Sequence, residues 1–139
     1  MRALMLLLTL MSLAATADTL EFDGRTIHYN LSPTTYLTPE VASTYQIKRS
    51  STRNLISIAV LDGPEHNAPP LAATINGEAR NLLSQLQTLT FREVREGNAI
   101  YYIATIDFHS EELWRFAIDI QLADGSSKQL RFEKTLYAD

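Results

Sequence analysis

The strict alternation of apolar and polar residues near the end of this chain limits the folds available to it more than any other feature. From Trp114 to Leu122 every second residue is large and apolar, Asp124-Gly125 follows, and the alternation resumes at Leu130. A period of two places alternate side chains on opposite faces of a strand, and Asp-Gly between two such runs is typical of a two-residue hairpin turn. The segment therefore predicts an antiparallel hairpin with one buried face.

The same period recurs along the chain. Residues 20–31 predict a hairpin around Asp23-Gly24, and residues 54–61 are apolar on both faces, which is typical of a central strand. Between them, Thr38 and Pro39 are the residues expected at the N-cap and first position of a helix. We therefore expect one short helix, from residue 39 to about residue 46.

A long hairpin is predicted next, with arms at 87–95 and 99–108. Along its first arm Leu89 and Val94 fall on opposite faces, and a β-bulge near Arg92 would restore the phase. The whole pattern predicts an all-β fold, an immunoglobulin-like antiparallel β-sandwich of seven or eight strands with one short helix. A small closed barrel is the alternative.

The first seventeen residues have the form of a secretory signal peptide. Arg2 supplies a positive charge, residues 3–13 are an uncharged apolar stretch, and Ala15-Thr16-Ala17 is a small-residue recognition site. Eleven residues rise only about 16 Å as a helix, well short of the roughly 30 Å hydrocarbon core of a bilayer. We therefore expect cleavage after Ala17 and export to the periplasm of a single domain, residues 18–139, that is not an integral membrane protein.

Composition excludes several classes of function. Without Arg2, 11 Lys and Arg residues stand against 16 Asp and Glu residues, a net charge of −5, which argues against nucleic-acid binding. The chain has no cysteine, and this excludes a disulfide, a thiolate nucleophile and a zinc–cysteine site. We expect no cofactor.

Catalytic and metal-binding patterns are weak. There is no G-x-S-x-G elbow and no glycine-rich phosphate loop, and the carboxylate pairs Glu93/Glu96 and Glu111/Glu112 are explained by charge near turns. His109 with Glu111 or Glu112 gives at most two ligands, and a zinc site needs three or four. The sequence therefore predicts no catalytic residue and no metal site.

Two charged segments remain as candidate binding sites. The first follows the helix and could hold a phosphate or an acidic partner, although a solvated connector is the simpler interpretation. The second alternates in sign from Arg92 to Glu96, which fits cross-strand ion pairing, or an Arg92 or Glu93 that turns inward and shapes a small pocket with Tyr101. The candidate binding residues are Lys48, Arg49, Arg53, Arg92, Glu93 and Tyr101.

Short strings of residues also carry a resemblance to a known family. They follow one another along nearly the whole chain after residue 17: Val41-Ala42 with Tyr45, Arg49-Ser50, Ile58-Ala59-Val60-Leu61, Asn81-Leu82-Leu83, residues 91–96, residues 99–103, Glu111-Glu112-Leu113, Arg115-Phe116, Leu130-Arg131-Phe132 and Leu136-Tyr137. The chain resembles domain-of-unknown-function family 4426, and the hairpin from Phe91 to Tyr102 is the most specific part of the match. The resemblance implies a signal-bearing envelope protein of Gram-negative bacteria with an immunoglobulin-like fold. It implies no reaction, ligand or catalytic residue.

These observations favour a non-catalytic binding or accessory domain that engages another envelope protein. The contact would be an exposed sheet edge that accepts a strand, or a surface patch around the helix and the connector at 48–53. The alternative is a small-ligand-binding protein with a pocket between the sheets or near the Phe91–Tyr102 hairpin. A hydrolase with an unrecognised site is the least favoured interpretation.

Overall fold

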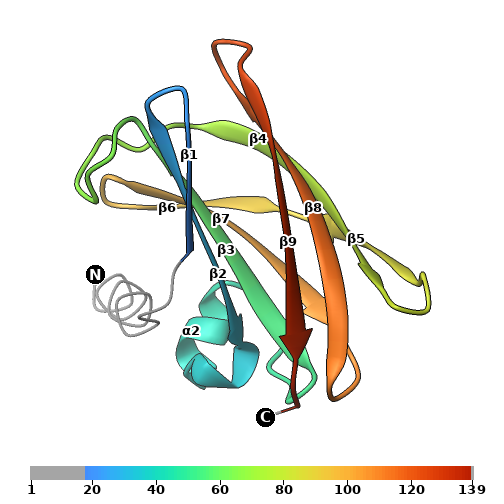
Figure 1. Cartoon of the computed structure of the whole chain (residues 1–139). Coiled ribbons are helices and arrows are strands. Elements are labelled where there is room, and N and C mark those ends of the chain that lie inside the picture. Colours follow the sequence, from blue (N-terminus) through green and yellow to red (C-terminus); the bar gives the residue numbers. More distant parts are fainter. Residues whose placement is uncertain (1–17, 139) are drawn as a thin grey trace.

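Two antiparallel sheets form the molecule in the computed structural model, which describes residues 18–138 (Figure 1). The first sheet has the strand order β1-β2-β3-β7-β6 and the second has the order β5-β4-β8-β9. The strands are β1 (Asp18–Phe22), β2 (Arg25–Pro33), β3 (Arg53–Leu61), β4 (Ala73–Asn81), β5 (Leu86–Thr90), β6 (Arg92–Glu96), β7 (Ala99–Asp107), β8 (Glu112–Leu122) and β9 (Ser127–Leu136). The predicted all-β sandwich is confirmed, with nine strands among these residues rather than seven or eight. The predicted signal peptide lies outside the described residues.

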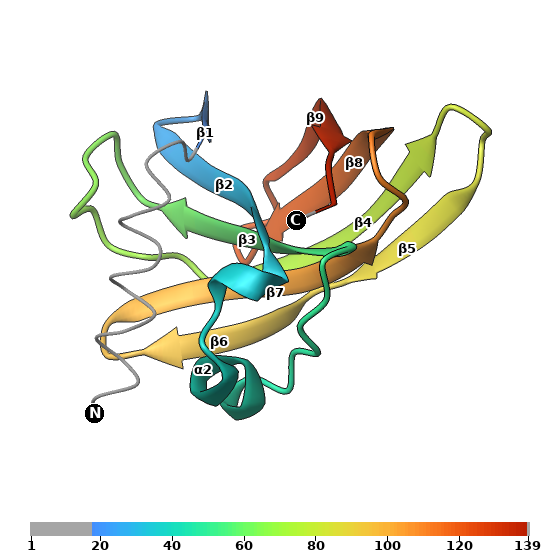
Figure 2. The same ribbon diagram turned by 90° about the horizontal axis from the view of Figure 1, so that it is seen from below.

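The core lies between the two sheets and follows the period-two pattern. The alternating residues of β8 from Trp114 to Leu122 are all buried, and so are Ile56, Ile58 and Val60 of β3. Two stacked aromatic rings, Phe116 and Phe132, have centroids 4.6 Å apart within this layer. Burial of these side chains holds the two layers together. Figure 2 shows the arrangement of the strands from below.

A short helical segment covers part of the outer face of the first sheet. It comprises a 3₁₀ turn, η1 (Thr34–Tyr36), and the helix α2 (Pro39–Thr44), which ends two residues earlier than predicted. The hydroxyl of Thr38 accepts a hydrogen bond from the Val41 N–H at 3.2 Å, so the predicted N-cap is present. None of the described helices is long and apolar enough to cross a bilayer.

The end of α2 is a Schellman motif that directs the chain toward the connector. Gln46 has a positive φ of 56°, the Ile47 N–H bonds the Ala42 carbonyl at 2.8 Å, and the Gln46 N–H bonds the Ser43 carbonyl at 3.1 Å. A second apolar cluster fixes this segment against the sheet: Leu37, Val41, Ala42, Ile47, Leu55 and Ile103. The position of Lys48, the next residue, is therefore set by a packed and capped helix end.

The predicted continuous arm at 87–95 with a β-bulge near Arg92 is wrong. The chain changes sheets at Phe91, because β5 pairs with β4 in the second sheet and β6 pairs with β7 in the first. Leu89 is buried between the sheets, whereas Val94 packs on the α2 cluster at the outer face, and this change of sheet produces the loss of phase. Gly77 allows close packing beside the crossover, since a Cβ there would lie 3.0 Å from the Ile118 side chain and 3.4 Å from the Phe91 ring.

Polar contacts connect the sheets at several places, among them one at Tyr102 and one at Arg25. The hydroxyl of Tyr102 in β7 accepts a hydrogen bond from the Ala73 N–H in β4 at 2.8 Å. Arg25, at the start of β2, pairs with Asp124 in the β8–β9 turn at 2.5 Å. Hydrogen bonds from Ser126 and then from Arg25 lower the pKa of Asp124 to about 2.

Candidate functional site

Three of the predicted binding residues surround one hollow on the outer face of the first sheet. Lys48, Arg53 and Arg92 line a space of about 370 Å³ where the connector after α2 passes β7 and the crossover between β5 and β6. We call it the basic hollow. The rest of its lining carries no charge: Gln46, Ile47, Leu55, Thr90, Ile103, Ala104 and Thr105. Two charged segments far apart in the sequence thus meet at one place.

Each cation is positioned by a different element. The Nε of Arg53 donates to Asp107 at 2.6 Å and its Nη1 donates to the Lys48 carbonyl at 3.0 Å, so the guanidinium is fixed at the start of β3. Arg92 opens β6 directly opposite Ile103. The side chains of Lys48 and Arg92 form no hydrogen bond or ion pair with any residue from 18 to 138. The hollow therefore holds one positioned and two unpaired positive charges.

The other predicted residues lie elsewhere. Arg49 donates from Nη2 to the Thr35 carbonyl at 3.0 Å and does not line the hollow. Glu93 points to the opposite face of β6, where it accepts hydrogen bonds from Arg95 at 3.0 Å and from the Tyr102 hydroxyl at 2.9 Å. These two hydrogen bonds, that from Arg95 first, lower the pKa of Glu93. Glu93 is therefore held in a hydrogen-bonded arrangement with Tyr102, on the face of the sheet opposite to Tyr101.

Tyr101 lies opposite Val94 on the outer face of the first sheet. Burial, and next the negative charge of Glu96, raise the pKa of its hydroxyl. Glu96 is buried as well, neither of its carboxylate oxygens has a hydrogen-bond partner among the described residues, and burial raises its pKa. Within residues 18–138 no three His, Cys, Asp or Glu side chains are grouped so as to hold a metal ion.

An apolar turn between β4 and β5 is the feature that the sequence reasoning missed. Leu82, Leu83 and Leu86 are 66%, 79% and 47% exposed, and the turn projects from the body of the sandwich (Figures 1 and 2). Tyr36 and Tyr137 are also highly exposed, and both follow strands that finish at this end of the sandwich, after β2 and after β9. The available signal was two consecutive leucines between the turn-forming residues Asn81 and Ser84.

The apolar turn is held in one conformation by the buried side chain of Asn81. Its Oδ1 accepts hydrogen bonds from the Leu83 N–H at 3.1 Å and the Gln85 N–H at 2.9 Å. Its Nδ2 donates to the Gln85 side chain at 2.7 Å and to Glu112 at 3.2 Å. The leucines are therefore presented on a braced backbone.

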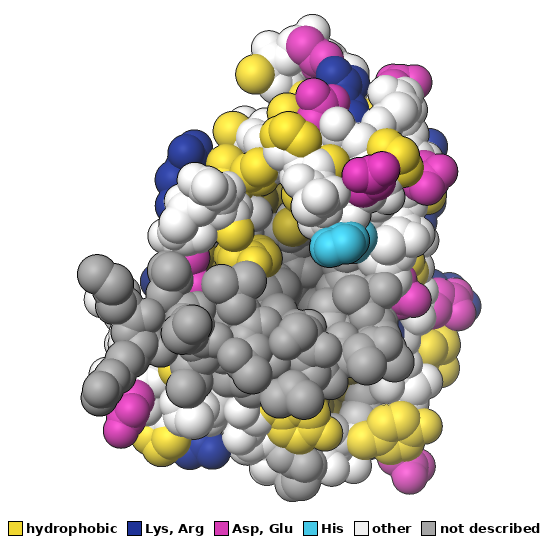
Figure 3. All heavy atoms as spheres, turned by 90° about the vertical axis from the view of Figure 1, so that its left-hand side faces the viewer, with side chains coloured by type: hydrophobic (Ala, Val, Ile, Leu, Met, Phe, Trp, Pro, Cys, Tyr) yellow, Lys and Arg dark blue, Asp and Glu magenta, His cyan; other side chains and the backbone are white. Residues whose placement is uncertain are grey.

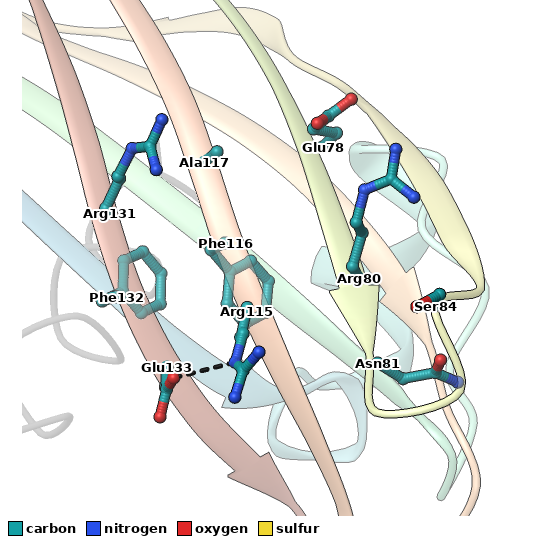
Figure 4. A pocket seen from close by; sticks show the side chains of 10 residues that line it. All are labelled: Glu78, Arg80, Asn81, Ser84, Arg115, Phe116, Ala117, Arg131, Phe132 and Glu133. Carbon is teal, nitrogen blue, oxygen red and sulfur yellow. Dashed lines mark hydrogen bonds and ion pairs between the residues drawn. The ribbon is translucent and has the colours of Figure 1, made fainter.

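A second hollow lies on the outer face of the second sheet, over Ala117 (Figure 4). Three arginines line its space of about 540 Å³: Arg80, Arg115 and Arg131. Two carboxylates line it as well, and Glu133 pairs with Arg115 at 2.9 Å, as the dashed line in Figure 4 marks. The second carboxylate is that of Glu78. This hollow is mixed in charge, unlike the basic hollow.

Elsewhere the described surface carries no broad positive field on the face in Figure 3, where acidic and basic side chains are interspersed. This distribution agrees with the acidic balance of the chain.

The two packed sheets define a small β-sandwich domain. Comparison with known proteins identifies the family of this domain. The family model of a domain of unknown function, DUF4426, matches residues 19–139. The chain belongs to the DUF4426 family, as the sequence resemblance predicted. No curated protein matches the sequence.

Solved structures with the same fold include proteins from two bacteria. A DUF4426 family protein from Pseudomonas aeruginosa PAO1 is 27% identical with a TM-score of 0.77, and the match covers 88% of this chain and 96% of that chain. FetP of uropathogenic Escherichia coli strain F11, expressed recombinantly in the periplasm, is 11% identical with a TM-score of 0.60, over 88% and 95% of the two chains. A copper-bound variant of FetP is also 11% identical, with a TM-score of 0.61 over 88% and 91%. The likeness to FetP concerns the fold alone.

Proposed function

We propose that this chain is a non-catalytic binding domain of the periplasm that engages another protein of the cell envelope. The apolar turn at Leu82, Leu83 and Leu86 is the observation that carries the proposal. The signal-peptide pattern before residue 18 and the periplasmic expression of FetP, a protein of the same fold, support the location. The proposal assigns no catalytic residue.

Two leucines on one braced turn, with a third at the start of the adjoining β5, need an explanation that scattered apolar residues do not. Single exposed apolar side chains are ordinary on a protein surface, whereas clustered ones mark interaction sites. Transfer of a leucine side chain from water to an apolar pocket contributes roughly 1.5–3 kcal/mol. Because Asn81 already fixes the backbone of the turn, little further ordering opposes binding. A partner with an apolar pocket at this end of the sandwich is the fitting counterpart.

Of the four edge strands, β1, β5, β6 and β9, the last two are poorly suited to accepting a strand from a partner. The edge strand β6 has only five residues, four of them charged. The longer edge strand β9 places Lys128 and Lys134 on the same side as its buried residues Leu130 and Leu136. Charged residues that point inward on an edge strand oppose pairing with another chain. Strand addition is therefore disfavoured at β6 and β9, and the other two edge strands, β1 and β5, have only five residues each.

A second candidate function is the binding of a small ligand near the hairpin from Phe91 to Tyr102. The position of the basic hollow favours it, since Arg92 and Ile103 of that hairpin line the hollow. This function predicts a saturable rise in melting temperature with a defined compound and requires no protein partner.

Photo-crosslinking in growing cells tests the protein-binding proposal. A photoreactive residue at Ser84, within the apolar turn, is compared with one at Lys128, at the start of β9. We expect one envelope protein to be captured from position 84 and not from position 128. The double substitution Leu82→Asn with Leu83→Asn is expected to reduce that capture about tenfold. Equal capture at both positions, or capture unaffected by the double substitution, would contradict the proposal.

A further inference from the structure

We infer that the basic hollow binds a small anionic group, a phosphate or a carboxylate. This inference does not rest on the protein-binding proposal, because the hollow lies on the outer face of the first sheet and shares no residue with the apolar turn. It names a ligand class for Lys48, Arg53 and Arg92, the three cations of the lining.

The charge balance of the hollow is the first argument. Three cations line it and no carboxylate does, although acidic residues outnumber basic ones in the chain. Asp107 pairs with Arg53 from beside the hollow and offsets one charge. Lys48 and Arg92 have no counter-charge among the described residues. Like charges held together repel one another, so an anion that joins them relieves this repulsion and gains charge-assisted hydrogen bonds.

Positioning of the donors is the second argument. The Nε and Nη1 of Arg53 are already engaged by Asp107 and the Lys48 carbonyl, which leaves its Nη2 unbonded among the described residues. A guanidinium fixed in this way loses little freedom when an anion binds. Thr90 and Thr105 also line the hollow, and a threonine hydroxyl can donate to an oxygen of a phosphate or carboxylate.

The size of the basic hollow and a comparison with the second hollow limit the kind of ligand that the basic hollow can bind. A space of about 370 Å³ is at the lower end of the range for small-molecule sites. It suits a free small anion or a single acidic group that projects from a larger molecule. The hollow over Ala117 is larger but includes Glu78 and Glu133, which repel an anion. The basic hollow is therefore the better anion site of the two.

Titration of the exported, ¹⁵N-labelled protein with inorganic phosphate tests the inference. Ionic strength is held constant with sodium chloride, so that screening is the same at every point. We expect saturable amide shifts at residues of the lining, Thr90, Arg92 and Ile103 among them. Arg92→Gln or Lys48→Gln should weaken the apparent affinity about tenfold, whereas Arg131→Gln, in the other hollow, should leave it unchanged. An unchanged melting temperature confirms that each variant is folded.

A second arm distinguishes the two sources of the anion. The same titration is run with succinate and with a capped tri-glutamate peptide. Saturation by phosphate or succinate below about 1 mM indicates a free small anion, and saturation by the peptide alone indicates an acidic segment of a protein; either supports the inference. Shifts no larger than those in sodium chloride for all three probes, or an equal effect of Arg131→Gln and Arg92→Gln, would overturn it. The Leu82→Asn, Leu83→Asn protein keeps this hollow, so failure here is distinguishable from failure of the protein-binding proposal.

Discussion

Replacement of Tyr102 by phenylalanine removes one hydroxyl that serves both sheets. That hydroxyl accepts a hydrogen bond from the Ala73 N–H at 2.8 Å and donates one to Glu93 at 2.9 Å. In the variant the Ala73 N–H loses its partner beside a buried ring, and leaving such a donor unpaired costs about 1–3 kcal/mol. Glu93 is exposed and keeps its pairing with Arg95, so the loss of its hydrogen bond with Tyr102 adds little to this cost. We expect the free energy of unfolding to fall by about 1–2 kcal/mol.

Urea unfolding at pH 7 measures this change. The midpoint should fall with no change in the dependence on denaturant, because the surface exposed on unfolding stays the same. Tyr101→Phe is the matched control, since Tyr101 lies on the other face of β7 and its hydroxyl bonds no described residue. The control should alter the free energy of unfolding by less than about 0.5 kcal/mol. Equal losses in the two variants would refute the assigned role of the Tyr102 hydroxyl.

Three further predictions concern other contacts. Hydrogen bonds, chiefly from Ser126, lower the pKa of Asp124 to about 2. The contribution of Asp124 to stability is therefore present above its pKa in the unfolded chain and is lost as the pH falls toward 2. Measurement of unfolding as a function of acid pH should show this loss in the parent and not in Asp124→Asn. Gly77→Ala places a Cβ 3.0 Å from Ile118 and should lower the free energy of unfolding by about 1–3 kcal/mol, measured by urea unfolding. An unchanged midpoint would show that Ile118 moves to accept the methyl group at no cost. Asn81→Ala removes the bonds that brace the apolar turn, and hydrogen exchange at the turn amides should accelerate while the core stays protected; equal protection in parent and variant would refute the bracing role.

Local signals were sufficient for the elements that are close in sequence. The β1–β2 and β8–β9 hairpins each follow from alternation around an Asp-Gly turn, and both are present. The turn at Asp23-Gly24 has two residues, with Phe22 opposite Arg25. The β8–β9 turn is longer than the two residues predicted, because Gln121 lies opposite Ser127. The start of α2 followed from Thr38 and Pro39. In each case the residues that determine the structure lie within a few positions of it.

Long-range pairing was beyond the sequence pattern. The crossover at Phe91 depends on which sheet the strands before and after it join, β5 with β4 and β6 with β7. In the sequence, a change of sheet interrupts the apolar–polar alternation in the same way as a β-bulge. The basic hollow joins Lys48 with Arg92 only because both pack beside β7, so its members were predicted without their arrangement. The exposure of Leu83 was missed because alternation does not show how far a turn projects.

Affinity between the exported protein and the envelope protein captured from its apolar turn tests the central claim most directly. Purified parent and the Leu82→Asn, Leu83→Asn protein are compared in equilibrium binding, with the melting temperatures of both measured first. Loss of two leucine contacts at roughly 1.5 kcal/mol each predicts about 100-fold weaker binding with little change in melting temperature. A change of less than about threefold, with both proteins folded, would contradict a partner site at the apolar turn.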